Sequence, residues 1–145
     1  MSDPVQTAME RFEVPAGHER FLFCLPLFYV AKADGAIAMK EVVSIAWNSV
    51  MQGLVQPGGD EQKAFNAFYK NKTYQFQGKS NLDDFAILAD AIDAQLAQYP
   101  AAEAQKIRDS IRAACTNVAQ SSGPLFRDKV SAEERQMLDK IFATL

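Results

Sequence analysis

Two carboxylates, Asp34 and Glu41, lie seven residues apart, one on each side of a predicted tight turn. Gly35 follows Asp34 directly, and glycine readily adopts the left-handed backbone conformation that ends a helix and reverses the chain. Such a turn would bring the two carboxylates close together. Because carboxylate oxygens are preferred ligands of calcium and magnesium, the pair predicts a divalent-cation site that backbone carbonyls and water would complete.

A purely structural role explains the same two residues. Asp-Gly is a common helix-terminating turn, and a glutamate near the start of a helix interacts favourably with the helix dipole. Two carboxylates are few for tight binding, and the loop lacks the ligand pattern of an EF-hand. Spacing alone leaves both interpretations of Asp34 and Glu41 open.

The elements that would position this turn are predicted to be helices. Asp3 and Pro4 indicate the start of a first helix, and a second, over about 18–33, should kink or break near Leu22 because Pro26 interrupts it. Five further helices are expected: about 39–54, after Asp60 to near Gly78, after Ser80 or Asn81 to near Tyr99, from near Ala101 to Ser121, and after Ser131. No segment alternates apolar and polar residues with a period of two for long enough to predict a strand. The fold class is therefore predicted as all-α, one compact domain over residues 1–145 with about six to seven helices.

The helix predicted over about 39–54 carries a wide apolar stripe. Its apolar residues recur near helical spacing, with Trp47 and Met51 widening the stripe beyond Val42, Val43, Ile45, Ala46, Val50 and Leu54.

A weak internal repeat links the two ends of the chain. Residues 30–35 (VAKADG) and 118–123 (VAQSSG) agree at three of six positions, and each segment ends an apolar helix and leads into another helix. The repeat favours two helix-loop-helix units related by pseudo-symmetry.

Residues 28–37 (FYVAKADGAI), followed by Glu41, resemble the signature of the tellurite-resistance TerB-like family. The resemblance implies a small all-α protein of two pseudo-symmetric helix-loop-helix units with an acidic metal site. It also implies a role in stress-response or membrane-associated complexes rather than a defined catalytic activity. In the second unit Ser122 replaces the acidic residue, although Asp128 and Glu134 could supply oxygens. The candidate ligands for calcium or magnesium are thus Asp34, Glu41, Asp128 and Glu134.

Composition argues against several classes of function. A net charge of −3 and a pI near 5.1 disfavour nucleic-acid binding, and a single histidine, His18, excludes a multi-histidine metal site. The N-terminal residues do not resemble a secretory signal, and the longest apolar run, residues 21–31, is about half a membrane span. Two isolated cysteines favour a reduced compartment. We therefore expect a cytoplasmic protein with no integral membrane segment.

Other residues of chemical interest have structural explanations. We expect Asp83, Asp84, Asp90 and Asp93 to form a solvated helix face, Cys24 and Cys115 to be buried and inert, and His18 to be exposed or to lie in a first helical turn. Lysines and aromatic residues occur together over 63–79, a mix that could bind phosphate-bearing ligands or anionic lipid, but most of the aromatic residues are needed for the core and the lysines form no dense patch.

The leading functional hypothesis is a non-enzymatic helical module that binds a protein partner, with a divalent cation optionally held by Asp34 and Glu41. One alternative is a metal-independent adaptor that receives a peptide or helix in a groove between the two units. A small hydrolase that uses acidic residues and a bound metal is a third, disfavoured, hypothesis.

Overall fold

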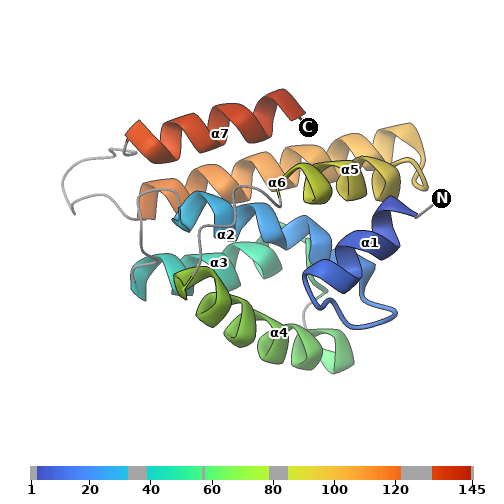
Figure 1. Ribbon diagram of the computed structural model, residues 1–145, viewed down its shortest axis with the longest axis horizontal. Coiled ribbons are helices and arrows are strands. Elements are labelled where there is room, and N and C mark those ends of the chain that lie inside the picture. The colour runs from blue at the N-terminus through green and yellow to red at the C-terminus, as the bar shows by residue number, and fades with distance from the viewer. Residues whose placement is uncertain (1–2, 33–38, 57, 79–84, 122–131, 145) are drawn as a thin grey trace.

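The computed structural model describes residues 3–32, 39–56, 58–78, 85–121 and 132–144 (Figure 1). These residues form seven α-helices and one 3-10 helix, and the described part of the chain contains no strand. The prediction of an all-α bundle is confirmed. In chain order the elements are α1 (Pro4–Arg11), η1 (Glu19–Cys24), α2 (Leu25–Lys32), α3 (Met39–Met51), α4 (Gly59–Gly78), α5 (Phe85–Leu96), α6 (Ala101–Ser121) and α7 (Ala132–Thr144).

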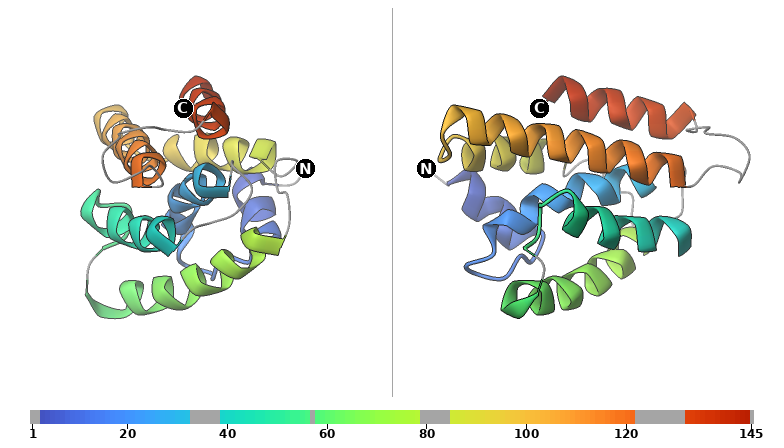
Figure 2. Two further views of the ribbon diagram at one scale, coloured as in Figure 1. Left: turned by 90° about the vertical axis from the view of Figure 1, so that its left-hand side faces the viewer. Right: turned by 180° about the vertical axis from the view of Figure 1, so that it is seen from behind.

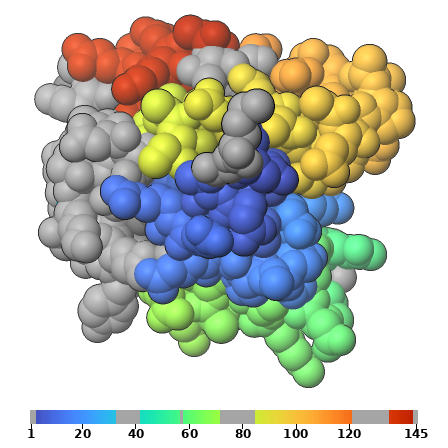
Figure 3. Space-filling model, turned by 45° about the vertical axis from the view of Figure 1, so that its right-hand side comes forward, coloured from blue at the N-terminus to red at the C-terminus, as the bar shows by residue number. Residues whose placement is uncertain are grey.

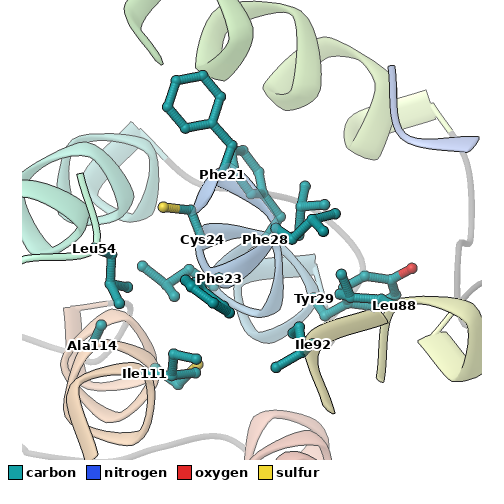
Figure 4. Packing of buried hydrophobic residues seen from close by; sticks show 14 of the residues in the cluster. Phe21, Phe23, Cys24, Phe28, Tyr29, Leu54, Leu88, Ile92, Ile111 and Ala114 are labelled. Carbon is teal, nitrogen blue, oxygen red and sulfur yellow. The ribbon is translucent and has the colours of Figure 1, made fainter. Parts of the chain in front are cut away.

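The core is organised around η1 and α2. Every residue from Phe21 to Ala31 is buried, so α2 has no polar face before Lys32. A helix that is apolar on all sides is stable only when neighbours cover it completely, and here α6, α4, α7 and α3 all pack against α2. Figure 4 shows the rings of Phe21, Phe23 and Phe28 extending from this segment toward the surrounding helices.

Local sequence explains where the first helices begin and end. The Asp3 carboxylate accepts a hydrogen bond from the backbone N–H of Val5 at 2.9 Å, which caps α1 as predicted. The predicted break in the second helix is also present, between Cys24 and Leu25. This position places Pro26 in the first turn of α2, where its missing N–H costs no helical hydrogen bond.

Helices α2, α3, α6 and α7 pack against one another, while the pseudo-symmetry of the pairs α2–α3 and α6–α7 stays a prediction. Helix α2 contacts α6 directly, α3 packs on α6, and α7 packs on α2 (Figure 2). Helix α1 lies along α5 on another side of the bundle (Figure 3). Within the described residues, no helix combines the length and the apolar character needed to cross a membrane.

Candidate functional site

The predicted metal site lies largely outside the described residues. Asp34 and Asp128 belong to segments that the structure does not describe. Glu41 and Glu134 lie in the first turns of α3 and α7, but their side chains are also outside the described part. The convergence of these four residues therefore stays a prediction. Among the described residues, no group of three or more His, Cys, Asp or Glu side chains could hold a metal ion.

The two cysteines are buried, as predicted. Burial raises the pKa of the Cys24 thiol from 9.0 to about 12, although a hydrogen bond with Ser49 and the charge of Arg20 lower it. Burial also raises the pKa of Cys115. Because the thiolate is the nucleophile, neither residue offers reactive sulfur near neutral pH.

Other singled-out side chains serve packing or solvation. His18 is half-buried directly before η1, and its ring stacks on Phe21 at a centroid distance of 4.9 Å. Asp90 and Asp93 are exposed on α5, as predicted for a solvated face. The pKa of the Asp93 carboxyl is raised, mainly by partial burial. The positive charge of Arg108 lowers this pKa, and the negative charge of Asp90 raises it. Asp83 and Asp84 lie outside the described residues.

The lysine and aromatic segment separates into two faces on α4. Phe65 and Phe68 are buried, whereas Lys63 and Lys70 are exposed. The half-buried Tyr69 donates a hydrogen bond from its hydroxyl to the carbonyl oxygen of Val42 at 3.0 Å, and burial raises its pKa. These aromatic residues therefore belong to the core and to the contact with α3.

Three residues of the apolar stripe on α3 lie on the surface. Val43, Trp47 and Met51 are exposed to 60%, 64% and 59% rather than directed into the core. Their spacing of four residues places them on one stripe of the helix. They are also all of the large apolar side chains that are exposed in the described part of the chain. We call this stripe the α3 face.

The side of α3 that faces the bundle carries Ile45 and the polar residue Ser49. Ile45 and Ser49 are fully buried and lie about 200° around the helix from Trp47. The Ser49 hydroxyl donates to the carbonyl oxygen of Ile45 at 2.7 Å. Since Ser49 also bonds to Cys24 of η1, the side of α3 opposite Trp47 is directed toward the centre of the molecule.

Asn48 links α3 to α6. Only 6% of this residue is exposed, and its amide nitrogen donates to the backbone oxygen and the hydroxyl of Ser44 at 2.9 and 3.0 Å. Its amide oxygen accepts a hydrogen bond from the Asn117 side chain at 2.9 Å. A buried amide costs free energy unless it is hydrogen-bonded, so this pair favours one rotation of α3 on α6.

A hydrogen bond from Arg20 of η1 holds the C-terminal end of α3 in place. The guanidinium of Arg20 donates from Nη2 to the carbonyl oxygen of Gly53 at 2.6 Å. Gly53 has a φ of 76°, the left-handed conformation that commonly ends a helix. Leu54 and Val55 then enter the core. With Tyr69 bonded near its other end, α3 is held along its length while the α3 face stays exposed.

The three residues of the α3 face are uncharged, but the first turn of α3 carries Lys40 and Glu41, and Lys40 stands on the same stripe one turn before Val43. Residues 42–59 contain no Asp, Glu, Lys or Arg, although 15 basic and 18 acidic residues occur in the whole chain. Figure 2 shows α3 at the side of the bundle, between α6 and α4. The arrangement can bury apolar surface against a partner, but its described side chains offer no charged or nucleophilic group for chemistry.

Comparisons with known proteins identify no relative. Neither a family model, nor a curated protein, nor a solved structure matches this chain. The TerB-like resemblance of residues 28–37 therefore stays a prediction.

Proposed function

We propose that this protein is a non-enzymatic helical interaction module that binds a protein through the α3 face. One observation carries the proposal: the large exposed apolar side chains of the described chain all lie on one stripe of one helix. Single exposed apolar residues are ordinary, whereas a contiguous group is typical of interaction sites. Tryptophan is also among the residues that contribute most to binding at interfaces.

The rigidity of α3 supports the same proposal. Its inner side is fixed by Asn48, Ser49, Arg20 and Tyr69, so a partner would meet a preformed surface. A preorganised surface loses little conformational entropy on binding, which favours affinity.

A substitution on the α3 face tests this function. Trp47→Glu places a charge at the centre of the face, and Ala67→Glu places the same charge on the exposed side of α4. Tagged wild type and both variants would be expressed in the native host, cross-linked and compared by quantitative mass spectrometry. We expect Trp47→Glu to reduce recovery of the bound protein at least tenfold, with Ala67→Glu equal to wild type. Equal recovery with all three chains would overturn the proposal.

A divalent cation held by Asp34 and Glu41 is a separate part of the proposal. It is supported by the carboxylate spacing and by the TerB-like resemblance, which also suggests a stress-response or membrane-associated complex. Calorimetric titration with calcium, magnesium and zinc, repeated on Asp34→Ala and Glu41→Ala, tests it. Binding that both variants abolish would support the metal site. No binding at millimolar ion would instead favour the metal-independent adaptor.

A further inference from the structure

We propose that the α3 face binds the α3 face of a second copy of this chain, in an antiparallel pair with twofold symmetry. The inference rests on the proposed function, because it names the protein that occupies the same face. Charge and geometry support it, and the area of the face indicates that the pair is weak.

The lack of charge favours an identical partner. A face without charged residues provides no attraction for a partner of opposite sign, and two such faces can meet without burying or opposing a charge. Residues 42–59 meet this condition, and the net charge of −3 per chain adds only modest repulsion between copies. A membrane surface is a weaker match, since α3 carries one basic residue, Lys40, whereas helices that lie on membranes are usually rich in Lys and Arg beside the apolar stripe.

The spacing of the α3 face suits packing against itself. Side chains four residues apart form a ridge, and the commonest helix packing sets two such ridges together at a crossing angle of about −50°. In an antiparallel pair centred on Trp47, the short Val43 of one copy lies opposite the long Met51 of the other. The two Trp47 rings meet at the twofold axis, where offset stacking favours aromatic pairs. The side chains of the α3 face are therefore complementary in size to those of a second α3 face that runs in the opposite direction.

The area of the face predicts a reversible dimer. With about 60% of each side chain exposed, the face offers on the order of 350 Å² per copy and a pair buries roughly 700 Å² from these residues. The half-buried neighbours Ala46 and Val50 add little, so the total stays below the roughly 1,000 Å² of a specific stable interface. An area of this size is typical of weak, transient complexes, so we expect a Kd in the micromolar range or weaker.

Sedimentation velocity and fluorescence on the purified full chain test the dimer. Trp47 is the only tryptophan, so its emission reports this face alone. Between about 1 and 500 µM chain, roughly the range that spans the expected Kd, we expect dimer to replace monomer while the emission maximum moves to shorter wavelength. Trp47→Glu should stay monomeric in sedimentation, and Ala67→Glu should dimerise as wild type does. Unfolding curves that match wild type would show that both variants are folded.

A mixing experiment tests the antiparallel register. Val43→Lys and Met51→Glu should each weaken self-association at least tenfold. Mixed together, they should form a heterodimer, because the introduced lysine of one variant lies opposite the introduced glutamate of the other only in the antiparallel pair. A mixture no tighter than either variant alone would overturn this register.

The remaining outcomes separate this inference from the proposed function. A chain that stays monomeric at the highest concentration overturns the dimer. If the cross-linking experiment still recovers a different protein in a Trp47-dependent way, the proposed function stands without the dimer. If no such protein is recovered, both the dimer and the proposed function fail. A monomer whose Trp47 emission shifts only with vesicles of phosphatidylcholine and phosphatidylglycerol also overturns the dimer and indicates a lipid surface.

Discussion

Asn48 joins two helices that lie far apart in the sequence. Replacing it with alanine removes both bonds to Ser44 and the bond from Asn117, whose exposed amide can bond to water instead. We expect Asn48→Ala to lower the free energy of unfolding by about 1–3 kcal/mol, as measured by urea denaturation. Asn66→Ala, at an exposed position of α4, is the matched control and should change it by less than about 0.5 kcal/mol. Equal effects of the two variants would mean that the Asn48 pair does not stabilise the α3–α6 contact.

The buried thiols predict a dependence of stability on pH. Since burial raises the pKa of Cys24 from 9.0 to about 12, the folded chain binds more protons than the unfolded chain between these values. The free energy of unfolding should therefore be unaffected by this group below pH 9 and should fall as pH rises from 9 toward 12. Cys24→Ser and Cys24→Ala should each show a smaller fall, measured by urea denaturation from pH 8 to 10.5.

The same burial predicts slow thiol modification. At pH 8 the folded chain should react with Ellman's reagent at least a hundredfold more slowly than the urea-unfolded chain, in which both cysteines are accessible. Two thiols per chain should titrate after unfolding. Rapid reaction of the native chain would contradict the buried positions of Cys24 and Cys115.

At the scale of the element, the end of α3 depends on one backbone conformation. No atom lies within 4 Å of where a Cβ on Gly53 would stand, so a substitution there meets strain rather than a clash. We expect Gly53→Ala to cost about 1 kcal/mol in thermal unfolding because alanine disfavours positive φ. Gly53→Asn should cost less, since asparagine tolerates the left-handed region. The opposite order of the two variants would argue against this helix ending.

The helices themselves could be predicted from the sequence, whereas the rotation of α3 could not. Asp3, Pro26 and the periodic apolar residues act within one or two turns, so they predicted the start of α1, the break before α2 and the helices that follow. In α3, apolar residues occur on both sides of the helix. The bond from Asn48 to Asn117, 69 residues away, favours the observed side, and no local pattern contains that information.

The α3 face was not predicted from the sequence. The apolar stripe with Trp47 was visible there, but only the fold places Trp47 on the surface and Ser49 in the core. The predicted metal ligands Asp34 and Asp128 lie outside the described residues. Whether segments between helices bring carboxylates together depends on loop geometry, which apolar periodicity does not determine.

At the scale of the whole molecule, the uncharged α3 face predicts that self-association responds weakly to salt. Raising sodium chloride from about 0.05 to 0.5 M screens charge interactions strongly. Without charges on the face to screen, the dimer Kd should change by less than about threefold, or tighten slightly as the net charge of −3 is screened. Sedimentation at both salt concentrations measures this, and a Kd that rises tenfold would indicate that charged residues elsewhere hold the dimer together.

The central position of α2 has a consequence for biosynthesis. This helix is translated before α6 and α7, which cover it. Until about residue 144 has left the ribosome, the apolar segment from Phe21 to Ala31 lacks some of the helices that bury it in the folded protein. Nascent chains of this protein should therefore depend on chaperones for much of their synthesis, and premature termination before α7 should yield an aggregation-prone product.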